Sequence, residues 1–208
     1  MKISGSVYID FGKILLFLSG MIMLFLFGPL LIKEVKYLLI PKGISWEVSD
    51  NGTFEQKQDE RSVVLVKDSE FGLVIPEINI NASIISNVDS TRPNVYQKAL
   101  TKGVAHGLGS SFPGEDGNVF LFSHSSLNLA DAFYYNSVFY LLYKLTLGDL
   151  IYVYYKGVKY TYVVGSKEVV LASETDYLKK GDREVLTLMT CWPPGTNFKR
   201  LIIRANPI

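Results

Sequence analysis

The sequence predicts an all-β domain, closed or sandwich-like, preceded by an apolar N-terminal segment. From Phe71 onward, short runs rich in β-branched and aromatic residues are separated by Gly, Pro, Asn and Asp, which is typical of strands joined by turns. Helical patterns are few in this region, and the chain is 48% hydrophobic and 13% aromatic. That composition supplies a packed core for one domain and excludes a chain disordered throughout.

The charge balance and the cysteine count exclude several classes of protein. The 208 residues include 21 Lys and Arg, 20 Asp and Glu, two His and one Cys. A formal net charge of +1 argues against a general nucleic-acid binder, which needs a surplus of cations. One cysteine permits neither an intramolecular disulfide nor a cysteine-based zinc site, so we expect no structural metal and no cofactor.

Residues 14–32 predict a transmembrane signal anchor that follows a short N-terminal tail, residues 1–13. They read ILLFLSGMIMLFLFGPLLI, 19 residues without a charge, and at roughly 1.5 Å per residue such a helix crosses most of a ~30 Å hydrocarbon layer. A cleaved signal peptide usually has a shorter apolar run that ends at small residues, whereas charged residues follow here. We therefore expect an uncleaved anchor in the lipid bilayer. Lysines on both sides of the segment leave its orientation open.

Residues 33–70 are expected to form a stalk or lead-in, and residues 71–208 the β domain. The lead-in is polar and charged around an Asn51-Gly52 turn signal, with residues 63–66 as its one candidate strand. In the β domain the candidate strands are 71–75, 78–81, 118–123, two aromatic runs in 150–164 about a Lys156-Gly157 turn, 167–171, 185–191 and 201–205. Helical patterns cover 94–100 and about 130–145, the second as one or two turns laid on the strands.

Cys191 is the first candidate for chemistry. It ends the run LTLMTC, and Trp192, Pro193 and Pro194 follow. Neither proline can donate to a ladder, so the strand should stop at the cysteine and place its sulfur beside a stiff loop. The alternative is a buried cysteine that packs as a small hydrophobic residue. If the domain lies outside the membrane, however, an unpaired thiol there is open to oxidation. A thiol that is kept in spite of this is more often a reactive one, which favours a role in chemistry.

His124 and His106 are the candidate bases. A thiol with its ordinary pKa near 8.5 needs a base or a cation beside it to act as a nucleophile at neutral pH, and histidine is the usual one. His124 lies where the apolar run LFS meets small polar residues. A hydrogen-bonded structural histidine is the alternative at that position. His106 lies in a Gly-rich stretch that looks like a shaped loop, and it is the less favoured candidate.

Arg200 is the candidate cation of the site. It follows Cys191 by nine positions and precedes the apolar run LIIRA, so a strand–loop–strand connection can return it beside the cysteine. There its guanidinium could donate to an oxyanion or hold a substrate carbonyl. An exposed charge at a strand edge is the alternative, and Lys199 and Arg204 compete for the same role on spacing alone.

These residues resemble a known family. The run Thr187 to Cys191 (TLMTC), followed by Arg200 and preceded by Ser123-His124, resembles the TLxTC signature and the Cys–His–Arg set of the sortases. Three further stretches also resemble that family. They are LVIP at 73–76, GVAHGLGSSFPGEDGN at 103–118 and LGDLIYV at 147–153. The resemblance runs from Leu73 to Ala205 in the family's order.

The resemblance implies an eight-stranded β-barrel anchored by an N-terminal helix, with residues 1–13 cytoplasmic and the catalytic domain outside a bacterial cell. It implies a cysteine transpeptidase that cuts an LPxTG-like C-terminal sorting signal after the Thr. Cys191 would form the thioacyl enzyme, His124 would transfer protons, and Arg200 would hold the substrate backbone or the oxyanion. Thr190 and Trp192 would contact the substrate. The implied partners are surface proteins that carry the signal and an amine acceptor, either a cell-wall precursor or another surface nucleophile.

The sequence also departs from the family's pattern. Ser125 stands where many members have Arg after the catalytic His, and the short connection CWPPGTNFKR resembles the minor classes, such as class D or E. There is no Asp-Pro pair from which to recognise the lid of the pilin-polymerising members, so anchoring to the wall or to another surface acceptor is preferred. Two other functions stay open. One is a different cysteine acyl-transferase, such as an L,D-transpeptidase, and the other is an inactive β-barrel that binds peptides.

Overall fold

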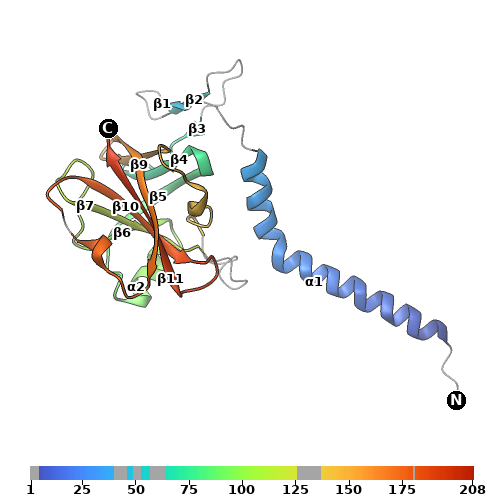
Figure 1. Cartoon of the computed structure of the whole chain (residues 1–208). Coiled ribbons are helices and arrows are strands. Elements are labelled where there is room, and N and C mark those ends of the chain that lie inside the picture. The colour runs from blue at the N-terminus through green and yellow to red at the C-terminus, as the bar shows by residue number, and fades with distance from the viewer. Residues whose placement is uncertain (1–4, 40–45, 49–52, 57–63, 126–136, 180) are drawn as a thin grey trace. The chain divides into compact units, whose positions relative to one another are not determined.

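The structure is a computed structural model that describes residues 5–39, 46–48, 53–56, 64–125, 137–179 and 181–208 (Figure 1). It divides into two units, Met1–Leu39 and Ile40–Ile208. The helices are α1 (Gly5–Leu39) and α2 (Pro93–Leu100), with 3₁₀ turns η1 (Pro76–Ile78), η2 (Leu142–Lys144) and η3 (Asp176–Leu178). The strands are β1 (Trp46–Val48), β2 (Thr53–Gln56), β3 (Val64–Leu65), β4 (Phe71–Ile75), β5 (Ile80–Val88), β6 (Val104–Gly107), β7 (Asn118–Phe122), β8 (Leu150–Tyr155), β9 (Val158–Leu171), β10 (Val185–Trp192) and β11 (Lys199–Pro207).

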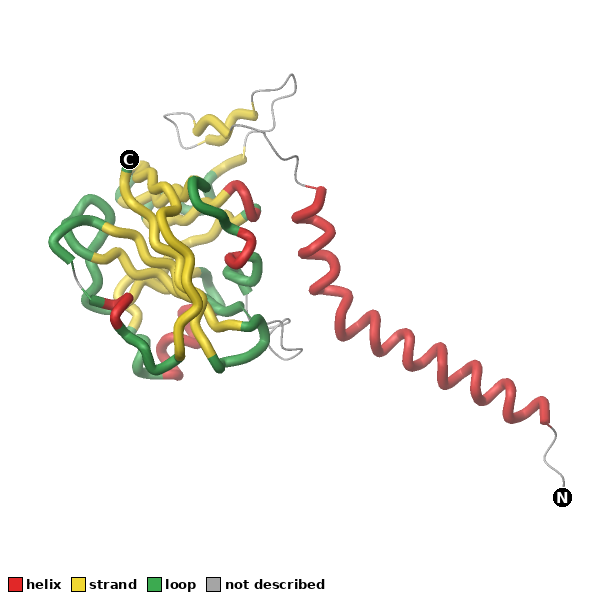
Figure 2. The backbone as a smooth tube through the Cα atoms, viewed as in Figure 1, coloured by secondary structure: helices red, strands yellow, loops and turns green. Residues whose placement is uncertain are grey.

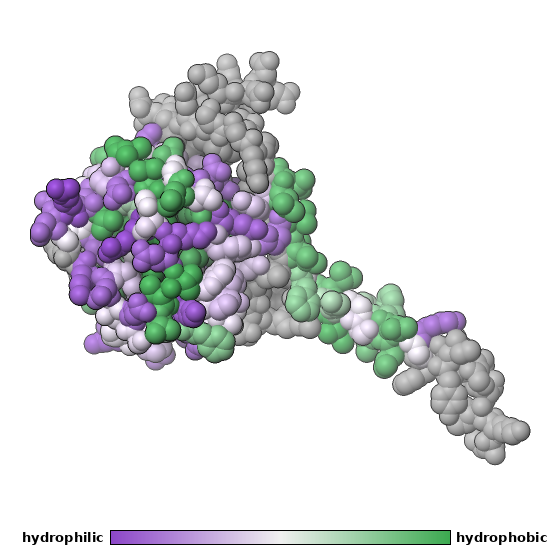
Figure 3. All heavy atoms as spheres, viewed as in Figure 1, coloured by the Kyte–Doolittle hydropathy of each residue, from purple (hydrophilic) through white to green (hydrophobic). Residues whose placement is uncertain are grey.

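Helix α1 makes up the first unit and contains the predicted anchor, residues 14–32. Its apolar side chains are exposed, as at Leu16, Phe17 and Leu24, and Figure 3 shows them in green along the helix. No helix in the described part of the chain is long and apolar enough to cross a membrane. The membrane span therefore stays a prediction.

Eight of the described strands form a closed barrel in the order β10-β11-β9-β8-β4-β5-β6-β7, and β7 pairs with β10 to close it. This confirms the eight-stranded barrel that the family resemblance implied. The pairs β5–β6 and β7–β10 are parallel, and the other pairs in the barrel are antiparallel. Figure 2 shows the strands in yellow and the few short helical segments of this unit in red.

The β8–β9 hairpin turns at the predicted Lys156-Gly157 pair. Both residues have positive φ, 52° and 76°, as a two-residue turn of type I′ requires. Residues 167–171 are strand, as predicted, but they do not form a separate strand, because β9 runs without interruption from Val158 to Leu171. Its pairing with β11 shifts register where Arg204 faces Ser166 and Ala205 faces Val164, so Gly165 is the extra residue of a bulge. The bulge lets the strand continue through a glycine that interrupts the strand pattern of the amino-acid sequence.

The lead-in segment contains more strand than the sequence predicts. Strands β1, β2 and β3 form a separate three-stranded antiparallel sheet, and only β3 was expected. The first two are three and four residues long and carry Glu47, Thr53 and Glu55, so they lack an apolar run that would have marked them. The predicted helical stretch at 130–145 is described only from residue 137, where it contains the 3₁₀ turn η2.

Alternate residues of the strands fill the inside of the barrel, because successive side chains on a strand point to opposite faces. The largest fully buried side chains there include Leu73, Leu121, Tyr162, Leu188 and Leu201. A second cluster lies on the outer face of β6 and β7, where α2 packs. Its buried members are Val88, Ala99, Leu100, Ala105, Phe120 and Phe122, and Ile85, Tyr96, Tyr177 and Met189 pack against them.

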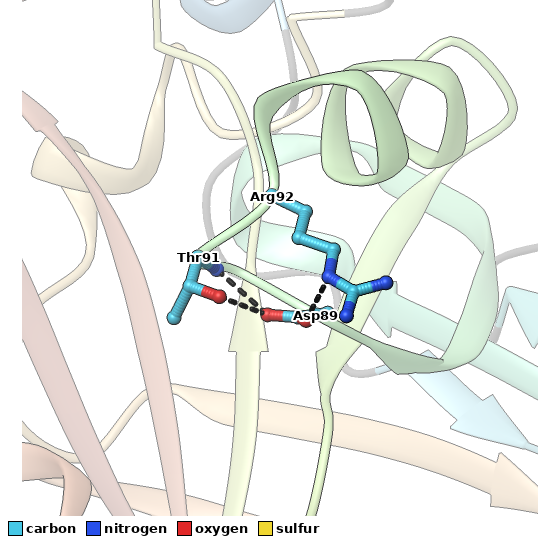
Figure 4. A network of polar contacts seen from close by, with 3 residues as sticks. All are labelled: Asp89, Thr91 and Arg92. Carbon is cyan, nitrogen blue, oxygen red and sulfur yellow. Dashed lines mark hydrogen bonds and ion pairs between the residues drawn. The ribbon is translucent and has the colours of Figure 1, made fainter.

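The entry to α2 is held by a small polar network (Figure 4). The Asp89 carboxylate accepts from the Thr91 hydroxyl at 2.6 Å and from its backbone N–H at 2.9 Å, and it pairs with Arg92 Nε at 3.2 Å. The hydrogen bonds of Thr91 lower the pKa of Asp89 below its ordinary value, and Arg92 adds to the effect. Pro93 then begins the helix with its fixed φ. The network thus fixes where α2 starts over the outer cluster.

Candidate active site

Strands β10 and β11 bring Cys191 and Arg200 together. The antiparallel register pairs Cys191 directly with Arg200, and directly opposed residues of a sheet carry their side chains on the same face. Strand β10 extends to Trp192, one residue past the predicted end, and Pro193 follows. Both Cys191 and Arg200 are partly exposed, so a substrate can reach them.

Strand β7 brings His124 to the same level of the barrel. It runs parallel to β10 with Phe122 paired to Met189, and the Ser123 N–H donates to the Met189 carbonyl at 3.3 Å. The Thr190 hydroxyl donates to the Ser123 carbonyl at 2.8 Å. These contacts carry the pairing beyond the last regular pair. His124, two residues after the end of β7, therefore lies near the level of Cys191, the penultimate residue of β10.

The three residues share the outer face of the barrel. On β7 the side chains of Phe120 and Phe122 belong to the outer cluster, and Met189 of β10 packs against it. Cys191 comes two positions after Met189 on β10, and His124 comes two positions after Phe122, just beyond the end of β7. Both positions continue the same alternation. The candidate nucleophile, base and cation therefore lie at the end of an apolar floor outside the barrel core.

The other two predicted residues, Thr190 and Trp192, alternate with Cys191 and so lie on the opposite face of β10. Thr190 is 2% exposed, and its hydroxyl is used within the protein. The Trp192 ring lies 5.6 Å from the Tyr143 ring, centroid to centroid. Thr190 thus belongs to the framework that joins β7 to β10, and direct contact of either residue with substrate stays a prediction.

The Arg200 guanidinium is oriented by its own loop. Its Nη1 donates to the carbonyls of Asn197 at 3.1 Å and Lys199 at 3.0 Å. A guanidinium has five N–H donors in a planar fork, so these bonds fix its direction and leave Nη2 and Nε for a substrate oxygen. Lys199 pairs with Trp192 on the other face, and Arg204 pairs with Thr187 four positions along the strand. Register thus separates Arg200 from both of its rivals.

Tyr177 is a neighbour of the site that sequence reasoning missed. It comes from the turn η3 between β9 and β10, and its ring lies 6.1 Å from that of Phe120 on the apolar floor. Burial raises the pKa of its phenol, while Arg200 lowers it and Cys191 raises it, so the hydroxyl lies within electrostatic reach of both. A single tyrosine in a polar loop carries no motif, and only the closed barrel places it here.

His106 lies away from this face. It is fully buried on β6 and pairs with Leu121, whereas its neighbour Ala105 belongs to the outer cluster. Its Nδ1 accepts the Asn87 N–H at 3.3 Å, and its Nε2 lies 3.0 Å from the Ser111 carbonyl. These partners require a proton on Nε2 and a lone pair on Nδ1, so the ring is the neutral tautomer protonated at Nε2. His106 is therefore a structural histidine of the barrel interior.

We expect this histidine to make folding stability depend on pH. Burial lowers the pKa of His106 below its ordinary value of 6.5, outweighing the hydrogen bond to Ser111. The unfolded chain then binds the proton first, so the contribution is fully present above about pH 6.5 and is lost as the pH falls through the folded-state pKa. The melting temperature should decline between pH 7 and pH 5. The melting temperature of His106→Phe should be lower than that of the wild type throughout this range, but it should fall less steeply with falling pH. Equal slopes for the variant and the wild type would contradict the assignment.

Within the described residues, no group of three or more His, Cys, Asp and Glu side chains could hold a metal ion. The face itself offers a thiol, an imidazole and a guanidinium. These three groups can serve as nucleophile, proton carrier and anion holder for acyl transfer.

Comparison with known families identifies the family of the chain. The model of a family described as the Sortase domain matches residues 73–208. The chain belongs to the sortase family. This sortase is similar to a solved structure of sortase C-1 from Actinomyces oris, with 31% identity and a TM-score of 0.57 over 68% of this chain and 76% of that one. No curated protein sequence matches it.

Two further structures extend the comparison. A lid mutant of sortase A from Corynebacterium diphtheriae is 27% identical, with a TM-score of 0.56 over 68% of this chain and 70% of that one. Sortase C from Clostridium perfringens is 30% identical, with a TM-score of 0.52 over 66% and 68%. Since the family consists of cysteine transpeptidases that act on sorting signals, the coarse activity of this sortase follows from its membership.

Proposed function

We propose that this sortase is a membrane-anchored transpeptidase that cleaves an LPxTG-like C-terminal sorting signal and transfers the protein to an amine at the cell surface. The observation that carries the proposal is the pairing of Cys191 with Arg200 on one face, with His124 just beyond the end of the adjacent strand β7. By their resemblance in sequence, these three residues match the family's Cys–His–Arg set, and this likeness also supports the proposal.

The reaction proceeds in two acyl transfers. The Cys191 thiolate attacks the carbonyl carbon of the signal's Thr, and the Arg200 guanidinium donates to the oxyanion that forms. His124 gives its proton to the departing amine as the peptide bond breaks, which leaves a thioester on Cys191. An acceptor amine then attacks the thioester, His124 takes its proton, and the thiolate leaves. Atoms and protons balance, and the enzyme returns to its starting state.

A trapping experiment tests the proposal. Full-length protein in detergent micelles is mixed with a peptide that carries an LPxTG signal, and intact mass and peptide mapping follow. We expect an acyl adduct on Cys191 that a primary amine discharges. Cleavage without this adduct would favour another hydrolytic chemistry, and binding without cleavage would favour the inactive peptide-binding barrel. Either result would reject the transpeptidase.

The anchor is the second part of the proposal. The 19 uncharged residues at 14–32 are its support, and an N-terminal anchor would hold the catalytic unit outside the cell. We expect the full chain to stay with membranes after an alkaline wash and a variant without residues 14–32 to be released. External protease should digest the β domain of intact cells. A full chain that washes off, or a protected β domain, would reject this part. The minor class and the preference for wall anchoring over pilus assembly rest on the sequence.

A further inference from the structure

We propose that the Ser125 hydroxyl is a positioning group that fixes His124 against Cys191, an inference that rests on the proposed function. Ser125 stands where many members of the family have Arg. The side chain is 1% exposed, and its hydroxyl donates to the backbone carbonyl of Cys191 at 2.7 Å. The residue after the candidate base is thus tied directly to the candidate nucleophile.

The bond takes the place of a missing rung in the parallel ladder. In a parallel pair, alternate carbonyls of one strand accept from alternate N–H groups of its neighbour. The Ser123 N–H donates to Met189 O at 3.3 Å, so the next donor in the pattern, two residues on, faces the carbonyl of Cys191. There the hydroxyl of Ser125 donates instead. The side chain extends the pairing by one step after the regular strand has ended.

A second contact shows why an extra tie is needed. The His124 carbonyl accepts from the Phe139 N–H at 3.2 Å, so the backbone at His124 already bonds to a segment outside β10. The Thr190 bond to Ser123 holds the residue before His124, and the Ser125 bond holds the residue after it. The residues on both sides of His124 are therefore hydrogen-bonded to residues of β10.

Loss of the Ser125 hydroxyl should affect turnover more than substrate binding. The hydroxyl bonds to the backbone carbonyl of Cys191, so in this proposal it acts by setting where the imidazole stands when the amine leaves. Misplacement of a catalytic group by about 1 Å can cost on the order of 10²-fold in rate. We expect Ser125→Ala to lower kcat by about 10- to 10²-fold while KM changes less than about twofold.

Ser123→Ala is the matched control. It removes the same atom two residues earlier, yet the Ser123 hydroxyl is buried and has no hydrogen-bond partner among the described residues. Its kcat should stay within about twofold of wild type. Ser125→Thr keeps the hydroxyl and should recover most of the lost kcat, although its extra methyl group is expected to lower the melting temperature.

The readouts are steady-state cleavage of a sorting-signal peptide, thermal unfolding and the rate at which iodoacetamide alkylates Cys191, all on the full chain in micelles. Since a base beside a thiol raises its reactivity, alkylation should slow in Ser125→Ala and not in Ser123→Ala. If the two alanine variants behave alike, or if the loss lies in KM, the inference is overturned.

If Ser125→Ala does not fold, Ser125→Thr decides. A kcat equal to that of the wild type would support the role of the hydroxyl, and a folded variant with a low kcat would reject it. A wild-type protein that cleaves no sorting peptide would overturn the proposed function alone. In that event the alkylation rates still test Ser125, because they need no substrate.

Discussion

Replacing Cys191 by alanine is expected to reduce peptide cleavage below detection while the protein still folds. Cys191 is the only thiol in the sequence, so no second thiol can take over the acyl group. Its side chain is small and partly exposed at a strand end, and such truncations usually cost about 1 kcal/mol of stability. The hydrogen bond from Ser125 ends on the backbone carbonyl, which the substitution keeps.

The measurements are cleavage of a sorting-signal peptide, intact mass after treatment with a thiol reagent, and the thermal midpoint. The variant should show no labelling and a midpoint within a few degrees of wild type. Cys191→Ser is the companion variant: it keeps the shape but offers a hydroxyl that is a far weaker nucleophile, so it should also be inactive. Cleavage at the wild-type rate in either folded variant would show that another residue attacks the substrate.

Replacing Arg200 is expected to produce the second largest loss. If its guanidinium donates to the oxyanion, Arg200→Ala should lower kcat by roughly 10²–10³-fold, the usual loss for one such donor. Arg200→Lys keeps the charge but should remain severely impaired. A lysine cannot hold the Asn197 and Lys199 carbonyls and still present further donors in the same plane, as the planar fork does.

Arg204→Ala provides the matched control for Arg200. Arg204 lies on the same strand and face but about 13 Å away at roughly 3.3 Å per residue, where it pairs with Thr187. Its removal should leave kcat within a few-fold of wild type. If Arg204 proved essential and Arg200 dispensable, both the register of β11 and the role assigned to Arg200 would be wrong.

Much of the barrel could be predicted because the local sequence pattern marks most of its strands. The apolar runs of β4, β7, β8 and β10 stand between turn residues, and Pro193 marks the end of β10 to within one residue. Strand β6 was missed because Val104 to Gly107 is a four-residue run between glycine-rich segments. The predicted strands stopped at residue 164 and resumed at 167, on either side of Gly165, because a glycine at a bulge and a glycine between two strands look the same in the local sequence.

The candidate site was predictable in its residue types but not in its neighbourhood. Cys191, His124 and Arg200 each stood at a strand end, which a one-dimensional pattern can locate. Which strand pairs with which is decided by long-range packing, so the contacts of Thr190 and Tyr177 could not be derived from their surroundings in sequence. His106 illustrates the same limit. Its Gly-rich context resembled a functional loop, whereas partners on two other segments make it part of the interior.

The parallel closure of β7 onto β10 has a consequence for how activity arises during folding. The bonds from Ser125 to Cys191 and from Thr190 to Ser123 join residues 66 and 67 positions apart. Contacts of such separation carry a large loop-closure entropy and form only when most of the intervening chain has condensed. In a nascent or partly opened molecule, therefore, His124 is not yet positioned beside Cys191. We expect turnover to require the completed barrel, so that an incompletely folded sortase does not process its substrates.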